Sequence, residues 1–238
     1  MQHMTKTAYI TGGSKGIGLG IAQAMVAEGM NVAITGRDAQ ALKTAAAELA
    51  KAGTGEVLAI TSDVRNLASE QQAIQQVLDK WGRLDVVIAN AGVGKFASIE
   101  DLTAEDWQAT IDINLTGVFH TVKASIPALK DSQGYIITIA SLAGTNFFKQ
   151  GSAYNASKFG LVGFSQAIML DLRQYGIKVT TIMPGSVATH FNDHTPSEKD
   201  AWKIQPEDIG ELVLDLLKMN PRTLPSKVEV RPTTPPGN

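Results

Sequence analysis

The chain has 238 residues, of which 44% are hydrophobic and 18% charged, and its formal net charge is −2. This composition predicts a globular protein with a sizeable core, and it lacks the basic excess that a nucleic-acid partner would require. The sequence contains no cysteine, which excludes disulfides, thiolate nucleophiles and cysteine-ligated metals. The four histidines are scattered, so we predict no metal site.

The apolar runs are about as long as a strand, well short of the roughly 20 residues that a membrane helix requires. The first residues also lack the cationic and apolar pattern of a secretory leader. We therefore expect a cytoplasmic protein with no membrane partner. Residues 1–4, M-Q-H-M, are interpreted as a remnant of an expression leader before a second start at Met4. Residues 232–238 are interpreted as a proline-rich tail.

Seven short apolar runs rich in β-branched residues predict strands at residues 8–11, 31–35, 56–61, 84–89, 135–140, 178–183 and 227–230. Between them, the helical period of apolar residues predicts helices at 17–28, 39–52, 67–80, 104–129 and 152–175. Strands that are apolar on both faces and joined by helices must be covered on both sides. The predicted fold class is α/β: a single doubly wound, Rossmann-type domain over residues 5–231, with a seven-stranded parallel sheet and helices on both faces.

The first predicted strand is followed by T-G-G-S-K-G-I-G, residues 11–18, which leads directly into a helix. Glycines at positions 12, 16 and 18 allow the backbone to turn tightly. They also allow a pyrophosphate to approach the amide groups at the helix N-terminus, where the helix dipole favours negative charge. The position of this turn between a strand and a helix predicts a dinucleotide site.

After the second predicted strand, the residues 35–38, T-G-R-D, allow two interpretations. Asp38 lies about 20 residues beyond Gly18, the distance of a carboxylate that holds the ribose of NAD. It also directly precedes a helix, where aspartate is an ordinary N-cap, and Gly36 at the strand tip offers no carboxylate. Arg37 and Lys15 suit the additional phosphate of NADP, or they are solvated surface charges. We favour NADP(H) over NAD(H).

The remaining strand ends also carry polar or small residues. Asp63 and Val64 follow the third strand and could bracket an adenine ring, or Asp63 could cap the next helix. The segments 90–92 (N-A-G) and 184–189 (P-G-S-V-A-T) follow the fourth and sixth strands. Ser141 follows the fifth strand, where it could alternatively be a cap. Ligands bind at this edge of a doubly wound sheet, so we expect the site here.

In the predicted helix that begins near residue 152, Tyr154 and Lys158 are four residues apart and therefore lie on one face. Such a pair also occurs by chance, as a solvated lysine beside a half-buried ring. An ammonium group close to a phenol favours the phenolate and lowers its pKa from about 10 toward neutrality. The spacing alone does not assign a role to either residue, so the rest of the chain must decide.

Together these motifs resemble the classical short-chain dehydrogenases/reductases, including members similar to 3-oxoacyl-carrier-protein reductases and carbonyl reductases. The resemblance extends from residue 7 to about 231 and rests on residues that occur in the family's order and spacing: Gly12, Gly16, Gly18, Asp63, Val64, Asn90, Ala91, Gly92, Asn114, Ser141, Tyr154, Lys158, Pro184, Gly185 and Thr189.

The resemblance implies a catalytic role for each of four residues. Tyr154 would be the general acid/base, and Ser141 would orient the substrate carbonyl. Lys158 would bind the nicotinamide ribose and lower the pKa of the tyrosine, while Asn114 would support a proton-relay water. A buried amide bonded to a neighbouring loop is the alternative for Asn114.

The resemblance also implies the ligand contacts. The expected cofactor-binding residues are Gly12, Ser14, Lys15, Gly16, Ile17, Gly18, Arg37, Asp63, Val64, Asn90, Ala91, Gly92, Tyr154, Lys158, Pro184, Gly185, Val187 and Thr189. The expected substrate-binding residues are Ser141, Ala143, Phe147, Phe148, Tyr154 and His190. Residues 143–150 and 190–204 are expected to form the substrate pocket, and the second segment is also expected to be a mobile lid.

The expected function is hydride transfer between NADP(H) and a small-molecule carbonyl/alcohol pair, by an enzyme of class EC 1.1.1.-. One alternative is a 3-oxoacyl-carrier-protein reductase, although only one cation, Lys130 or Arg173, stands in each region where such enzymes tend to have arginines for the acidic carrier. A non-catalytic NADP-binding sensor is the alternative of another class. A homodimer or homotetramer is expected through the helices at 104–129 and 152–175, because the second has more small and apolar residues than one core-facing stripe needs.

Overall fold

The computed structural model describes residues 5–234, without the side chain of Asp193. The predicted expression remnant and the last four residues of the predicted tail lie outside the described residues. No helix within residues 5–234 is both long and apolar enough to cross a bilayer.

Seven strands form one sheet: β1 (Thr7–Thr11), β2 (Asn31–Gly36), β3 (Val57–Thr61), β4 (Val86–Ala89), β5 (Tyr135–Ile139), β6 (Lys178–Pro184) and β7 (Lys227–Val230). Their order across the sheet is β3-β2-β1-β4-β5-β6-β7, and every neighbouring pair is parallel. The predicted seven-stranded parallel sheet is therefore confirmed.

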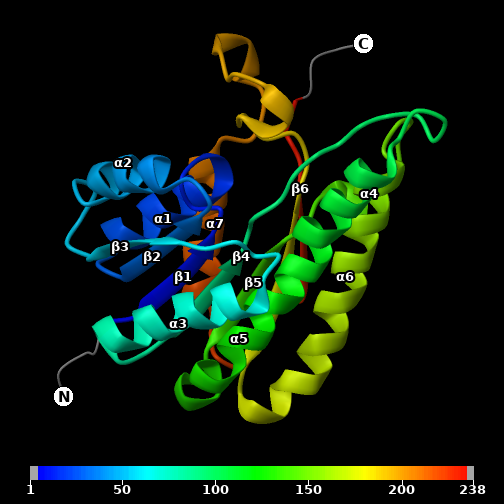
Figure 1. The fold of residues 1–238 in the computed structure, drawn as a ribbon. Helices are drawn as coiled ribbons and strands as arrows, with labels where there is room; N and C mark the ends of the chain where they lie inside the picture. The colour runs from blue at the N-terminus through cyan, green and yellow to red at the C-terminus, as the bar shows by residue number, and fades with distance from the viewer. Residues whose placement is uncertain (1–4, 235–238) are drawn as a thin grey trace.

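Helices cover both faces of this sheet (Figure 1). On one face lie α1 (Gly16–Ala27), α2 (Ala39–Leu49) and α7 (Pro206–Lys218). On the other lie α3 (Leu67–Trp81), α5 (Gly117–Ser132) and α6 (Ser152–Leu172), with α4 (Ala104–Ile111) packed against α6. The predicted doubly wound arrangement is confirmed as well.

The strand side chains alternate between two hydrophobic cores. In β1, Ala8 and Ile10 enter the core shared with α1, α2 and α7, whereas Tyr9 enters the core shared with α3, α5 and α6. All three side chains are fully buried. This two-sided burial explains why the strands read as continuous apolar runs rather than as alternating polar and apolar residues.

The chain changes its direction of travel across the sheet between β1 and β4. From β1 it proceeds outward to β2 and β3, and it then returns to β4 beside β1 before it continues to β5, β6 and β7. A crevice forms at such a point beyond the carboxyl ends of the strands. The glycine-rich turn after β1 and the residues after β4 therefore meet at the same edge.

The helix predicted at 104–129 is interrupted, which corrects that prediction. A π-helical turn, η1 (Asp112–Thr116), separates α4 from α5. Its buried residue Asn114 reaches across to the loop after β4, where its side chain hydrogen-bonds both backbone groups of Val93. These tertiary bonds stabilise a local geometry that the continuous apolar period of the sequence does not reveal.

The lid segment between β6 and α7 contains two 3₁₀ turns, η4 (Phe191–Asp193) and η5 (Glu198–Asp200). Asn192 within η4 has left-handed backbone angles, with φ of 55°. The segment returns to the sheet edge through a bridge between Val187 and Ile204. Its two ends are thereby held together, while the mobility of the lid stays a prediction.

Candidate active site

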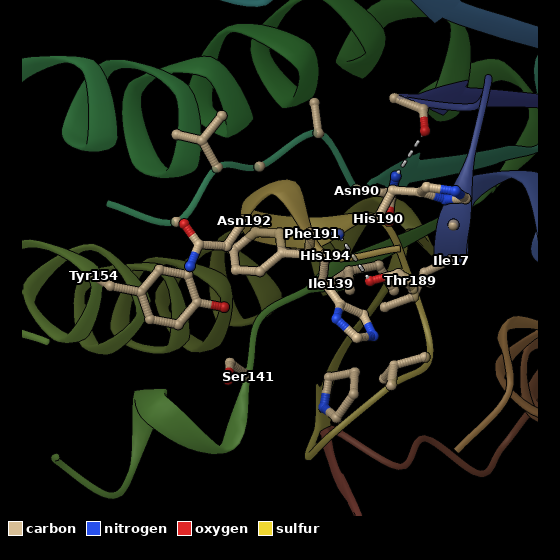
Figure 2. Close-up of a pocket in the computed structure, with 18 of the residues that line it drawn as sticks. Ile17, Asn90, Ile139, Ser141, Tyr154, Thr189, His190, Phe191, Asn192 and His194 are labelled. Carbon is tan, nitrogen blue, oxygen red and sulfur yellow. Dashed lines mark hydrogen bonds between the residues drawn. The ribbon is translucent and has the colours of Figure 1, made fainter. Parts of the chain in front are cut away.

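A cavity of about 670 Å³ lies at the carboxyl ends of the central strands. It is lined by sixteen of the residues that the sequence predicts for the site: Gly12, Ser14, Lys15, Gly16, Ile17, Asn90, Ala91, Gly92, Ser141, Tyr154, Lys158, Pro184, Gly185, Val187, Thr189 and His190. Figure 2 shows Tyr154 and Ser141 at one end of the drawn residues and Ile17 at the other. Among the predicted residues, Gly18, Arg37, Asp63, Val64, Asn114, Ala143, Phe147 and Phe148 do not line this cavity.

The glycine-rich turn is shaped for an anionic ligand. Gly12 and Gly16 have left-handed φ angles of 67° and 57°. A Cβ atom on Gly18 would lie 2.4 Å from the carbonyl oxygen of Gly12, so only glycine allows helix and turn to pack this closely. Helix α1 begins after Lys15 with no side-chain cap and no acidic residue in its first turn. Its first amide groups are thus left for a ligand such as a diphosphate.

The residues after β4 are fastened to this turn by a set of hydrogen bonds. The Asn90 and Ala91 amides donate to the Thr11 hydroxyl, at 3.0 and 3.1 Å. The Asn90 side chain donates to the carbonyl oxygens of Thr11 (2.8 Å) and Gly12 (3.1 Å). Asn90 therefore fixes the floor of the cavity rather than offering its side chain to a ligand.

Ser141 and Tyr154 lie together at one end of the cavity. The Ser141 hydroxyl accepts a hydrogen bond from the Ala143 amide (3.1 Å), as the cap of the short turn η2 (Leu142–Gly144), and so keeps its proton for donation. Burial raises the pKa of the Tyr154 phenol, and a hydrogen bond with Ser141 partly counteracts this rise. The net direction is opposite to the expected lowering by Lys158, because burial is the larger influence on this phenol.

Lys158 is buried, with 5% of its surface exposed. Its Nζ lies 5.7 Å from the centre of the Tyr154 ring and donates to the Ile139 carbonyl oxygen at 3.0 Å. Burial lowers its pKa to about 8, so the ammonium still predominates at neutral pH. A Cβ atom on Gly92 would lie 3.8 Å from Nζ, so glycine at this position keeps the approach to the ammonium open.

The side chain of Asn114 is fully hydrogen-bonded to the protein. Its Oδ1 accepts from the Val93 amide (2.8 Å), and its Nδ2 donates to the Val93 carbonyl oxygen (2.9 Å) and to the Ser157 hydroxyl (3.0 Å). These bonds match the alternative role considered for Asn114 in the sequence analysis, that of a buried amide bonded to a neighbouring loop. Asn114 joins η1 to α6 and to the loop behind the catalytic residues.

At the adenosine end, Asp38 is the N-cap of α2, and its Oδ1 accepts from the amides of Gln40 and Ala41, both at 3.0 Å. The capping interpretation is therefore confirmed. Asp63 does not cap α3, because Asn66 does. Its carboxylate instead pairs with Arg65, a residue that the sequence analysis did not single out, and this pairing lowers the pKa of Asp63.

An aromatic wall surrounds Tyr154. The ring centres of Phe96, Phe191 and Phe148 lie 5.4, 5.7 and 6.4 Å from its own. Phe96 and Phe191 line the cavity. The sequence analysis missed Phe96, and it included Phe191 only as part of the segment 190–204. Phe147 does not line the cavity, and its side chain is 85% exposed, so its substrate contact stays a prediction.

Several known proteins are similar to this chain. The family model described as short chain dehydrogenase matches residues 6–200. A D-beta-hydroxybutyrate dehydrogenase of Cupriavidus necator is 41% identical over 77% of this chain and 71% of its own length. A 3-oxoacyl-[acyl-carrier-protein] reductase of Synechocystis sp. is 37% identical over 86% of each chain. An alcohol dehydrogenase from the archaeon Thermococcus sibiricus, in a structure with 5-hydroxy-NADP, superposes with a TM-score of 0.91 at 30% identity, covering 98% of this chain and 100% of the other.

The fold and the cavity thus define a nicotinamide-dependent oxidoreductase that acts on a carbonyl/alcohol pair. The chain belongs to the short-chain dehydrogenase family, which confirms the resemblance that the sequence motifs indicated.

Proposed function

We propose that this protein is an NADP(H)-dependent carbonyl reductase or alcohol dehydrogenase, in which residues 5–231 form one cofactor-binding and catalytic domain. The observation that carries the proposal is the convergence of Ser141, Tyr154 and Lys158 on one cavity with the glycine-rich turn. The uncapped start of α1 fits the diphosphate of a dinucleotide. When bound, the nicotinamide cofactor supplies or accepts the hydride.

In the reductive direction, the Tyr154 phenol donates its proton to the oxygen of the substrate carbonyl. Its raised pKa keeps the proton in place until the oxygen gains negative charge. The Ser141 hydroxyl donates a hydrogen bond to the same oxygen and stabilises that charge. Lys158 uses one N–H for the Ile139 carbonyl, so its remaining donors are available to the nicotinamide ribose. Asn114 holds η1 and the Val93 loop behind these groups.

For the cofactor, we propose a preference for NADP(H). Asp38 is the helix cap of α2, where its Oδ1 accepts from two amides, and this role accounts for the carboxylate without a contact to the ribose of NAD. Arg37 lies close enough to Asp63 to lower the pKa of that carboxyl, so it stands on the same side as the residues expected around the adenine. Arg37 and Lys15 would bind the additional phosphate.

For the substrate, we propose a small molecule with an apolar or aromatic group beside the reacting carbon. Phe96 and Phe191 contact Tyr154 and line the cavity, which supports this class. Of the predicted substrate contacts, Ser141, Tyr154 and His190 line the cavity, whereas Ala143 is buried behind it.

A 3-oxoacyl-carrier-protein reductase is the second candidate, because a relative with that name is 37% identical. Of the two cations that could meet an acidic carrier, Lys130 stacks over the Tyr175 ring at 3.6 Å. A non-catalytic sensor fits less well, because it would be expected to lose the tyrosine or the lysine, whereas Ser141, Tyr154 and Lys158 all line the cavity. Cytoplasmic location stays a prediction.

The predicted homodimer or homotetramer would use the helices α4 to α6. Their exposed Trp107, Phe119, Phe159 and Leu170 support it, since each is at least 40% exposed. Light scattering that shows a monomer at micromolar concentration would contradict it.

The test of the catalytic proposal is Tyr154→Phe. We expect turnover of a carbonyl panel with NADPH to be abolished while NADPH binding, followed by nicotinamide fluorescence, stays within about threefold of wild type. Turnover near the wild-type rate would remove Tyr154 from its proposed role.

Cofactor preference is tested by separate titrations with NADPH and NADH, repeated with Arg37→Ala. Tighter binding of NADPH that weakens selectively in the variant would support the phosphate contact. Equal binding of the two cofactors by wild type would contradict it.

A further inference from the structure

Apart from the Tyr154 phenol, the titratable side chains that line the cavity belong to basic residues. Among the described lining residues, four are lysines and two are histidines, and none is a carboxylate: Lys15, Lys95, Lys158, Lys203, His190 and His194. Lys158 belongs to the catalytic end, and Lys15 to the glycine-rich turn. Lys203 and His194 come from the lid segment and have no part in the function described so far.

These two lid residues are held by one buried carboxylate, Asp200, which is 5% exposed and does not line the cavity. Its Oδ1 accepts from Lys203 Nζ at 2.6 Å, and its Oδ2 accepts from His194 Nε2 at 2.8 Å and from the Ser197 amide at 2.9 Å. The bond with Lys203, followed by that with His194, holds the pKa of the Asp200 carboxyl well below its ordinary range. The ionised carboxylate can only accept, so His194 donates to it.

The position of Lys203 is fixed relative to the glycine-rich turn. The next residue, Ile204, exchanges backbone hydrogen bonds with Ser186 (3.1 Å) and Ala188 (2.9 Å). Further along, Pro206 packs so closely on α1 that a Cβ atom on Gly20 would lie 2.5 Å from its carbonyl oxygen. The root of the lid therefore rests on the same helix whose uncapped N-terminus faces the cavity.

We propose that Lys203 forms an anion subsite on the lid for the diphosphate of the dinucleotide, across the cavity from the glycine-rich turn, with His194 beside it on the same carboxylate of Asp200. This proposal rests on the proposed function. Asp200 is the positioning residue: it lies behind the two side chains and directs them toward the cavity wall. A diphosphate carries two negative charges, and the amides of α1 reach it from one side only. The Lys203 ammonium on the other side would make lid closure depend on cofactor binding.

The test compares Lys203→Met with the control Lys199→Met, which removes an exposed lysine of the same segment that does not line the cavity. The probes are NADPH and adenosine 2′-monophosphate, which has no diphosphate, and binding is measured by calorimetry. In Lys203→Met we expect the Kd for NADPH to rise about tenfold, equivalent to about 1.4 kcal/mol, with an unchanged Kd for the monophosphate. Lys203→Arg keeps the charge and should bind NADPH within about threefold of wild type.

The outcomes separate this proposal from the one on which it rests. No binding of NADPH to the wild-type protein would contradict the proposed function itself. Normal binding of NADPH by both wild type and Lys203→Met would overturn the subsite alone. A third outcome is that Lys203→Met leaves NADPH binding intact but raises KM for a ketone that carries a carboxylate and not for a neutral ketone. The subsite would then bind the substrate rather than the cofactor, which also overturns the proposal. Equal weakening in the Lys199→Met control would reduce the effect to general surface charge and overturn it too.

Discussion

Two helices of the same layer, α3 and α6, each bury a charged side chain, but the two side chains differ in how many hydrogen bonds the protein provides to them. On α3, Glu70 is fully buried, and its carboxylate accepts hydrogen bonds from the hydroxyls of Tyr9 (3.1 Å), Ser62 (2.6 Å) and Thr121 (2.8 Å). On α6, Lys158 is almost as buried, but the hydrogen bond to Ile139 is the one that its ammonium makes within the described chain.

The difference shows how to distinguish a structural charge from a functional one. The Glu70 carboxylate is satisfied by the fold and lies away from the cavity, and burial and its own charge keep the Tyr9 phenol protonated as a donor by raising the pKa of Tyr9. The Lys158 ammonium lies at the cavity with donors to spare, so the cost of its burial is offset only when a ligand binds. Unused hydrogen-bonding capacity, rather than burial, marks the functional group.

The largest expected effect is on activity in Lys158→Met. Removing the ammonium takes away both a ribose contact and a positive charge close to Tyr154, so we expect kcat to fall by at least about a thousandfold. Steady-state rates with NADPH and a responsive ketone provide the measurement. A fall in kcat of less than tenfold would contradict the functional role of Lys158 and would make it, like Glu70, a structural charge.

The corresponding change in the other region is Glu70→Ala, which leaves three buried hydroxyls without their acceptor. We expect the free energy of unfolding to fall by about 4 kcal/mol, measured by urea denaturation. Glu70→Gln, which retains one acceptor oxygen, should lose less than half of that amount. Stability equal to wild type in Glu70→Ala would show that the network contributes nothing.

The pH dependence of stability sharpens the comparison further. The pKa of Lys158 is lowered from its ordinary value to about 8 in the folded protein, so the unfolded chain binds more protons between about pH 8 and the ordinary lysine pKa of about 10.4. Burial of the charged Lys158 should therefore cost up to about 3 kcal/mol of stability below pH 8. This cost should disappear as the pH rises through the window. Unfolding of Lys158→Met relative to wild type should show an advantage at pH 7 that shrinks by pH 10.5. A difference that is constant with pH would contradict the lowered pKa.

The smallest effect is expected for Asp38, an exposed residue whose carboxylate has a structural role as a helix cap. Its Oδ1 accepts both amide hydrogen bonds of the α2 cap, so Asp38→Ala should reduce the free energy of unfolding by about 1 kcal/mol without changing the ratio of NADPH to NADH affinity. Asp38→Asn, an equivalent cap, should match wild type in both. A selective loss of NADH binding in Asp38→Asn would assign this carboxylate to the ribose.

Local sequence patterns were sufficient for the fold and for the floor of the site. The apolar runs and helical periods predicted the parallel sheet, and the glycines at 12, 16 and 18 predicted the turn, because each depends on residues that are neighbours in the chain. Asp38 could be interpreted in two ways, since the same position serves a cap and a ribose contact.

The rest of the site depends on contacts between distant segments. Phe191 meets Phe96 and Tyr154 only after the lid folds back over the sheet edge, and no periodicity reports such a meeting. The bonds between Asn114 and Val93 create the π-helical turn, although the apolar pattern through 104–129 continues unbroken. Phe147 is an aromatic residue of the type expected in the substrate pocket, but its side chain faces solvent. The path of its loop backbone sets this orientation, and the sequence pattern does not reveal that path.

The π-helical turn at Asp112–Thr116 has a consequence for engineering this chain. A turn of this kind accommodates one residue more than an ordinary α-helical turn, so the surfaces of α4 and α5 are out of phase by about 100°, the angle of one residue. Deletion of a single residue within the turn would restore a regular helix and rotate Trp107 and its neighbours around the axis, toward or away from α6. Loop insertions elsewhere shift only the loop, whereas a change of length here turns an entire helix.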